Sequence, residues 1–345
     1  MSRFMLRIKA FVFRVLQSIF TLCDLYLSHP LPQRVSFTRT IPSSTGSTSG
    51  SFDILFYTPP SYSQKPTKRH PILINFHGGG FTIGHARDDA RWATAVINRT
   101  SAVVASINYR LAPAHPFPVA IEDCVSAVLW LWQHADDLHL DISRTAFSGF
   151  SAGGNLTYAV AIRLHEELAK MKAQQQDDVK IGRLVGLVAF YGSVDWTRSR
   201  VERDASNPNL IPVIPATLFR LFDESYLYPT PDMKSPLLSP GIAPSQLLRD
   251  ALPDKLVIID CSGDQLLAES EEFKSRLRNL GKTVGGCTVE GVGHAWERDL
   301  VLGGGIRRGM RRMNLLLRGW RGFGSEGDGL VGRVNSWGLL YYMLA

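Results

Sequence analysis

Short apolar runs bounded by turn residues alternate along the chain with longer segments of helical periodicity. The runs predict buried strands at 71–76, 102–108, 145–150, 184–191, 255–260 and 283–289. Helical spacing predicts helices near 87–98, 119–134, 152–172 and 268–280. Two further strands are expected at 31–40 and 51–58, joined by a Ser/Thr/Gly-rich loop. Strands that alternate with helices in this way predict an α/β fold with a mostly parallel central sheet and helices on both faces.

The first 34 residues precede this pattern and contain an amphipathic segment at 3–27. A transmembrane span is disfavoured because Arg14 and Asp24 interrupt the apolar run. A signal peptide is disfavoured because Thr21-Leu22-Cys23-Asp24 does not resemble a cleavage site. We expect a helix that caps a pocket or lies on a membrane surface.

Two other segments depart from the strand and helix alternation. Residues 195–250 are rich in proline and aromatic residues, which indicates a helical lid inserted between core segments 35–194 and 251–302. Residues 303–345 contain eleven glycines and seven arginines, without a clean period. We assign no role to this tail.

The charge distribution and the cysteine content limit the functions expected of this chain. The net charge of +7 resides at the two ends, with +3 in residues 1–27 and +5 in residues 303–345, so the body is close to neutral. Nucleic-acid binding is therefore not expected. The four cysteines have no metal-binding spacing, which favours buried thiols in a reducing compartment and a cytoplasmic location.

A candidate nucleophile lies between a predicted strand and a predicted helix. Gly149, Ser151 and Gly153 form a G-x-S-x-G pattern at that junction. Such a turn lifts a serine hydroxyl above the sheet, and its small neighbours let the following helix approach. An isolated match would equally fit a turn without chemistry, so the assignment depends on partners elsewhere.

A serine nucleophile needs a base and a carboxylate that orients the base. His294 lies in a glycine-containing loop after the last predicted strand, and Asp264 follows the strand at 255–260. Asp260 is the rival carboxylate but belongs to the strand end, and Glu269 falls within the next helix. The order Ser, Asp, His is that of an α/β-hydrolase.

Backbone donors for an oxyanion are also present. Gly78, Gly79 and Gly80 follow the strand at 71–76 and offer N–H groups without side-chain obstruction. The N–H of Ala152, directly after the serine, would complete the oxyanion hole.

Taken together, the motifs resemble the hormone-sensitive-lipase-like branch of the α/β-hydrolases. The signature stretches are His77-Gly78-Gly79-Gly80-Phe81, Tyr109-Arg110-Leu111-Ala112-Pro113 and Gly149-Phe150-Ser151-Ala152-Gly153-Gly154-Asn155, with supporting text at 235–240 and 263–266. The resemblance spans about 30–300 and implies a cap built from the N-terminus and residues 195–235. Phe150 stands where this family often has Asp, and the chain after Leu302 does not match.

The resemblance implies a serine carboxylesterase with Ser151 as nucleophile, His294 as base and Asp264 as orienting acid. Gly79, Gly80 and Ala152 would bind the oxyanion, with Gly78 in the same loop. No cofactor or metal is needed for such chemistry. Some similar proteins are tailoring esterases of fungal secondary metabolism. Acyl transfer with the same triad, or ligand binding by a non-catalytic receptor, are the alternatives.

Aromatic residues in the predicted lid indicate the kind of substrate. They are Trp196, Phe219, Phe222, Tyr226 and Tyr228. An apolar pocket lined by such side chains favours small or medium esters.

Overall fold

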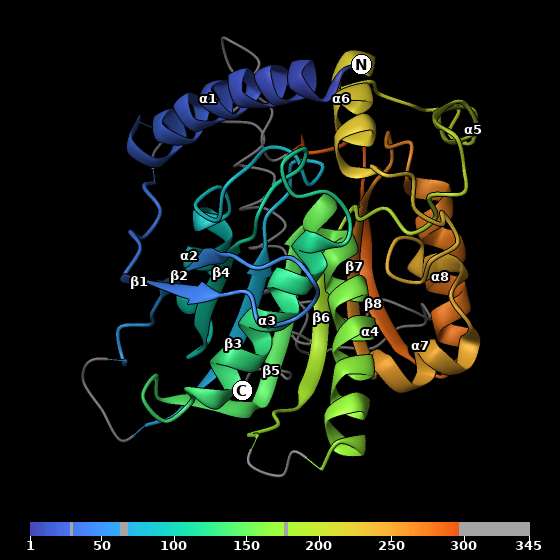
Figure 1. Cartoon of the computed structure of the whole chain (residues 1–345). Coiled ribbons are helices and arrows are strands. Elements are labelled where there is room, and N and C mark those ends of the chain that lie inside the picture. The colour runs from blue at the N-terminus through green and yellow to red at the C-terminus, as the bar shows by residue number, and fades with distance from the viewer. Residues whose placement is uncertain (28–29, 63–67, 176–178, 297–345) are drawn as a thin grey trace, which may run out of the picture.

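A computed structural model describes residues 1–27, 30–62, 68–175 and 179–296. Its centre is an eight-stranded sheet in the order β1-β2-β4-β3-β5-β6-β7-β8 (Figure 1). The strands are β1 (Phe37–Pro42), β2 (Ser51–Tyr57), β3 (His70–Phe76), β4 (Val103–Asn108), β5 (Leu140–Phe150), β6 (Leu184–Phe190), β7 (Lys255–Cys261) and β8 (Thr283–Val289). The predicted α/β-hydrolase architecture is confirmed.

The sheet is parallel from β4 to β8 and antiparallel at one edge. β1 pairs with β2 and β2 with β4 in antiparallel register, whereas β4, β3, β5, β6, β7 and β8 pair in parallel. The carboxyl ends of the parallel strands therefore meet along one edge of the sheet. Loops that follow β3, β5, β7 and β8 carry the candidate site residues to that edge.

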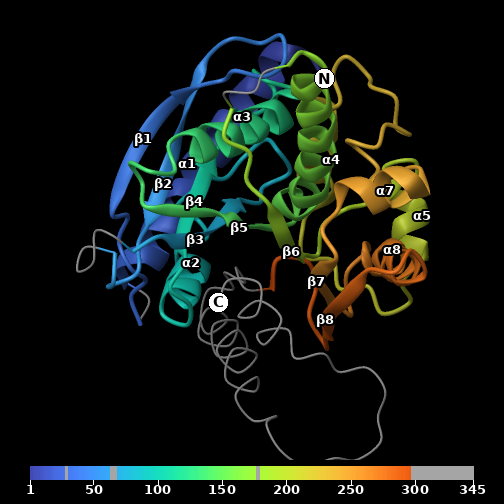
Figure 2. The same cartoon turned by 90° about the horizontal axis from the view of Figure 1, so that it is seen from below.

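Helices cover both faces, as the alternation predicts. The helices of the core are α2 (Ala90–Ile97), α3 (Val119–Gln133), α4 (Ala152–Ala173) and α8 (Leu267–Asn279). α3, α4 and α8 share one apolar cluster with the sheet, and α2 belongs to a second cluster on the opposite face (Figure 2). All seven residues of β3 are buried, which explains why its sequence is a continuous apolar run rather than an alternating one.

The N-terminal helix α1 (Arg3–Leu27) lies across the end of the molecule that bears the carboxyl ends of the strands. It packs beside α6 (Ala216–Tyr226), although the two are far apart in sequence (Figure 1). Polar side chains fasten α1 to the core: Arg14 donates to the carbonyl oxygens of Thr82 (2.9 Å) and Ala112 (2.6 Å). Thus α1 covers loops next to the predicted oxyanion site.

The region between β6 and β7 is partly helical. It contains α5 (Arg200–Ala205), α6, a 3₁₀ turn at Pro240–Ile242 and α7 (Ser245–Ala251). Its first helix begins with a full capping box between Ser199 and Glu202, which the local sequence explains. The predicted tail at 303–345 lies outside the described residues.

Three local expectations were wrong. The first strand begins at Phe37 rather than at Leu31, since Pro32 has no N–H to donate and the Gln33 N–H bonds to Thr94 Oγ1 (2.7 Å) instead of a strand. β5 begins at Leu140, so the segment expected to be a turn is already extended and pairs with β3. Cys23 is exposed on α1 instead of buried, whereas Cys124 and Cys261 are buried.

Candidate active site

Ser151 occupies a strained turn between β5 and α4. Its backbone has φ 54° and ψ −113°, a combination that non-glycine residues rarely adopt. The neighbouring glycines are required by close packing. A Cβ on Gly153 would lie 1.9 Å from the carbonyl oxygen of Phe76, and one on Gly149 would lie 2.2 Å from that of Gly153. The turn therefore fits the geometry of a nucleophile elbow.

The structure brings Ser151, His294 and Asp264 together. Ser151 Oγ lies 2.7 Å from His294 Nε2, and His294 Nδ1 lies 2.6 Å from Asp264 Oδ2. Asp264 is 2% exposed and His294 is 7% exposed, so water competes little for these hydrogen bonds. A hydroxyl, an imidazole and a carboxylate thus form one continuous chain.

The loop that carries Asp264 is held from two sides. The Leu266 N–H donates to Asp264 Oδ1 over 3.1 Å, which fixes the carboxylate from within the loop. Asn207, from the segment after α5, donates through Nδ2 to the backbone oxygens of Asp264 (2.7 Å) and Ser262 (2.9 Å). Sequence reasoning missed Asn207, because an Asn-Pro-Asn stretch in a loop carries no signal of this contact.

The segment after Asn207 also covers the loops that carry Asp264 and His294. Ile211 N–H donates to the Gly263 carbonyl over 2.8 Å. A Cβ on Gly263 would touch the Ile211 side chain at 2.7 Å, and one on Gly293 would touch Val213 at 2.5 Å. These contacts explain the glycines beside Asp264 and His294 and place two apolar side chains over the loops.

The rival carboxylates are engaged elsewhere. Asp260 lies 2.5 Å from Lys274 Nζ and accepts a hydrogen bond of 2.7 Å from Ser270. Burial raises the pKa of the Asp260 carboxyl, against the lowering effect of Lys274. Asp260 of β7 is therefore a structural carboxylate that pairs with α8 rather than with His294.

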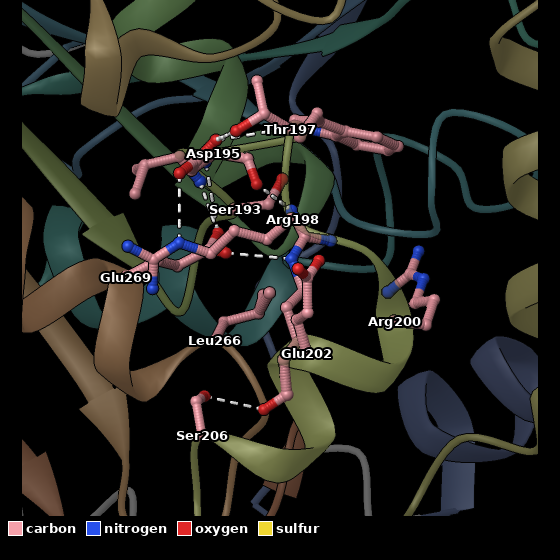
Figure 3. Close-up of polar contacts among 12 residues, drawn as sticks. Ser193, Asp195, Thr197, Arg198, Arg200, Glu202, Ser206, Leu266 and Glu269 are labelled. Atoms are coloured by element: carbon pink, nitrogen blue, oxygen red, sulfur yellow. Dashed lines mark hydrogen bonds and ion pairs between the residues drawn. The ribbon is translucent and has the colours of Figure 1, made fainter.

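Glu269 anchors the segment between β6 and β7 to the core rather than serving the histidine. It accepts from the N–H groups of Val194 (2.8 Å) and Asp195 (3.3 Å) and forms a buried ion pair of 2.9 Å with Arg203 of α5. Figure 3 shows Glu269 beside the Asp195 turn, with Thr197 and Arg198 bonded to the same aspartate. Burial raises the pKa of the Glu269 carboxyl, while Arg203 acts in the opposite direction.

The predicted oxyanion loop follows β3 and turns tightly against the elbow. A Cβ on Gly78 would lie 3.6 Å from Ser151 Cβ, so this backbone directly adjoins the serine. Gly79 and Gly80 adopt positive φ angles of 111° and 57°. In the described part of the chain, neither of their N–H groups donates to another backbone carbonyl. Ala152 is the first residue of α4, so its N–H has no partner within the helix.

Tyr109 supports this loop from the end of β4. Its hydroxyl donates to the His77 carbonyl over 2.7 Å, and its ring stacks on the His77 ring with centroids 4.2 Å apart. Arg110 next to it pairs with the buried Asp123 at 2.7 Å. The Tyr-Arg pair therefore holds loops in place.

Phe150, the departure from the family pattern, belongs to an aromatic cluster. Its ring stacks on Phe190 at 4.1 Å and meets the edge of Trp92 at 6.2 Å. An aspartate here would place a carboxylate among buried rings. The substitution relative to the family is accommodated by apolar packing on the α2 face of the sheet.

The five aromatic residues of the predicted lid do not form a single pocket wall. Tyr226 is fully buried and stacks on Phe81 at 3.8 Å, with Trp196 alongside at 6.2 Å. Phe222 lies over Gly80, while Phe219 lies under the guanidinium of Arg200 and Tyr228 under that of Arg3. Of the five, Phe222 is the residue that a Cβ on Gly80 would meet.

A cavity of about 790 Å³ opens between α1 and the antiparallel edge of the sheet. Its walls include Arg14, Asp88, Asn108 and Arg110, and none of the three triad residues lines it. Within the residues that the structure describes, no group of three or more His, Cys, Asp or Glu side chains is placed to hold a metal ion.

Comparison with known proteins gives a consistent family assignment. The profile of the alpha/beta hydrolase fold family matches residues 73–298. An arylesterase of Saccharolobus solfataricus is 29% identical over 70% of this chain and 73% of its own. A probable carboxylesterase 6 of Arabidopsis thaliana is 34% identical, over 44% of each chain.

Solved structures agree with the fold. An esterase of Pyrobaculum calidifontis superposes with a TM-score of 0.65 at 24% identity, covering 90% of this chain and 92% of its own. A thermostable esterase of Pseudomonas putida gives a TM-score of 0.68 at 20% identity, covering 90% and 89%. With residues 73–298 matched and the elbow, sheet order and strand-end loops in place, the chain belongs to the alpha/beta hydrolase fold family.

Proposed function

We propose that the protein hydrolyses carboxylic esters through an acyl-enzyme formed on Ser151. The observation that carries the proposal is the hydrogen-bonded chain from Ser151 through His294 to Asp264. Esterases and carboxylesterases among the relatives agree with it. No part of this chemistry requires a cofactor or metal ion.

In the proposed reaction, Ser151 Oγ attacks the ester carbonyl while His294 Nε2 takes the hydroxyl proton. Asp264 accepts from His294 Nδ1–H and stabilises the imidazolium that forms. The N–H groups of Gly79, Gly80 and Ala152 receive the oxyanion, with Gly78 positioning their loop. His294 then protonates the departing alcohol, and water, deprotonated by the same imidazole, releases the acid from the serine.

We propose small or medium, partly apolar esters as substrates. Phe222 over the oxyanion loop, together with Ile211 and Val213 over the catalytic loops, supports an apolar surround for the acyl or alcohol group.

Turnover of p-nitrophenyl acetate and butyrate tests the mechanism. Ser151→Ala is expected to abolish turnover and labelling by a fluorophosphonate, with an unchanged melting curve. Ser206→Ala, at the end of α5, is the matched serine control and keeps both activities. Unaltered turnover in Ser151→Ala would overturn the proposal, as would a wild-type protein that the probe does not label.

Two further measurements define the reaction and its substrate. Product analysis with an added acceptor alcohol separates hydrolysis from acyl transfer, because transfer yields a new ester in place of free acid. A panel of acyl lengths tests the substrate class. Activity restricted to long-chain triacylglycerols would contradict the proposed preference.

A further inference from the structure

The two sides of α1 have an arrangement opposite to that of an ordinary surface helix. Three of its polar residues face the protein: Gln17 and Thr21 donate to Asp88 over 2.9 and 2.7 Å, and Asp24 pairs with Arg91 at 2.8 Å. A helix that packs on a soluble core normally buries its apolar side and exposes its polar side.

The opposite side of α1 is apolar and exposed. Only Leu6 and Ala10 of the helix are buried. Twelve of the twenty large apolar residues that are exposed in the described chain lie here: Phe4, Met5, Ile8, Phe11, Val12, Val15, Leu16, Ile19, Phe20, Leu22, Tyr26 and Leu27. They include positions 4, 8, 11, 15, 19, 22 and 26, whose spacing of three or four residues forms one continuous stripe. A patch of this kind marks an interaction surface.

The charges around the stripe identify what it contacts. Asp24 is the only acidic residue in the helix, and it is turned inward onto Arg91. Arg7 and Lys9 are exposed and lie on opposite borders of the apolar stripe, since they are two residues apart on a helix of 3.6 residues per turn. Basic side chains beside an apolar face are complementary to anionic lipid headgroups above an acyl layer.

Length and composition alone would also allow α1 to cross a bilayer, a property found in no other helix of the described residues. The docked position argues against a crossing. Arg14, Gln17, Thr21 and Asp24 bond to the globular core, and a spanning helix would have to give up these contacts and take the four polar groups into hydrocarbon.

From these contacts we propose that α1 attaches the protein to the surface of an anionic phospholipid bilayer. The helix stays docked on the core, with its outer face in the boundary between headgroups and acyl chains. Because α1 crosses the carboxyl-end side of the sheet and binds Thr82 of the oxyanion loop region, attachment would hold the candidate active site close to the lipid surface (Figure 1).

Vesicle flotation of the full chain tests this attachment and does not depend on ester hydrolysis. The probes are vesicles of phosphatidylcholine alone and of phosphatidylcholine mixed with phosphatidylserine. Wild-type protein is expected to float with the mixed vesicles, and less so at high salt because ions screen the basic residues. Phe11→Ser with Ile19→Ser is expected to weaken partitioning by about tenfold or more. Arg7→Gln and Lys9→Gln are each expected to weaken it by about fivefold.

Val201→Ser is the matched control, because Val201 of α5 is 77% exposed and Phe11 of α1 is 65% exposed. It is expected to float like the wild type. Circular dichroism melting and vesicle-free turnover of p-nitrophenyl butyrate check that each variant is folded.

Three outcomes would overturn the proposal. The first is wild-type protein that does not float with the mixed vesicles. The second is a wild-type dimer in light scattering that the Phe11→Ser, Ile19→Ser variant converts to a monomer, since a second copy would then cover the stripe. The third is protein that stays in cell membranes after alkaline carbonate extraction, which would indicate a spanning helix.

Discussion

Asn207 donates a hydrogen bond of 2.7 Å from its side-chain amide to the backbone oxygen of Asp264. The two residues are far apart in sequence, and the contact links the segment after α5 to the loop that carries Asp264, the partner of His294. The loop conformation therefore depends on a residue that does not touch the reacting atoms.

Replacing Asn207 is expected to slow turnover more than it weakens binding. In Asn207→Ala the Asp264 loop loses two hydrogen bonds, so the carboxylate shifts relative to His294. We expect kcat to fall about 10- to 100-fold with little change in KM, because small displacements of catalytic groups are costly. Asn209→Ala is the exposed control. Equal kinetics of the two variants would exclude a positioning role for Asn207.

Asp260 at the end of β7 and Asp264 in the loop after it are expected to respond in opposite ways. Asp264→Asn should lower kcat about 10⁴-fold with little loss of stability, because the orienting charge is removed from His294. Asp260→Asn should instead lower the free energy of unfolding by about 3 kcal/mol, because Lys274 loses a buried partner. Kinetics and urea denaturation of both variants check the contrast. A larger loss of kcat in Asp260→Asn than in Asp264→Asn would instead assign the orienting role to Asp260.

In the predicted oxyanion loop, the steric clash caused by one Gly→Ala substitution can be relieved by a second substitution. A Cβ on Gly80 would lie 2.3 Å from the Phe222 ring, whereas one on Gly79 would lie 2.3 Å from the backbone oxygen of Ile83. We expect each Gly→Ala change to reduce kcat about 100-fold by displacing the oxyanion donors.

The activity of each double variant is compared with that of Phe222→Ala alone. On this scale, adding Phe222→Ala to Gly80→Ala should restore part of the lost activity, whereas adding it to Gly79→Ala should restore none. Gly281→Ala is the control for backbone strain, because Gly281 has a positive φ but open space around it. Equal recovery in both double variants would show that Phe222 is not the obstacle.

The pH dependence of stability is expected to report on His70. Burial lowers the pKa of the His70 imidazole from its usual 6.5, partly opposed by its bond to the Ser101 carbonyl. As the pH falls below about 6.5, the unfolded chain takes up a proton that the folded chain resists, so the free energy of unfolding decreases. In urea denaturation between pH 7 and 5, the free energy of unfolding of His70→Gln should fall less steeply than that of the wild type. The difference in slope is expected to be on the order of the linkage of one proton. Identical slopes would contradict this.

The fold was largely predictable because its signals are local. β3, β5 and β7 are buried on both faces and read as continuous apolar runs, while α3 and α4 follow helical spacing. The observed element boundaries differ from the predicted ones where strand pairing outweighed the local sequence pattern. Leu140 joins a strand because β3 lies beside it, which the turn-like residues that follow do not reveal.

The candidate site was predictable in part. Gly149, Ser151 and Gly153 form a motif because the strand-to-helix turn has strict local requirements. His294 and Asp264 could be selected from their positions after strands. Asn207 and the Arg203–Glu269 pair could not, because each contact joins distant segments through the fold.

The sequence by itself determined the order of elements, the small residues at the elbow and the three candidates for the chemistry-bearing side chains, since these depend on neighbours in the chain. Only the tertiary structure decided that Ser151, His294 and Asp264 form one hydrogen-bonded chain, and which side of α1 faces outward. The amphipathic pattern was visible beforehand, but its orientation depends on the carbonyl and carboxylate partners of Arg14, Gln17 and Thr21. Those partners meet the helix only after the sheet and its strand-end loops have assembled.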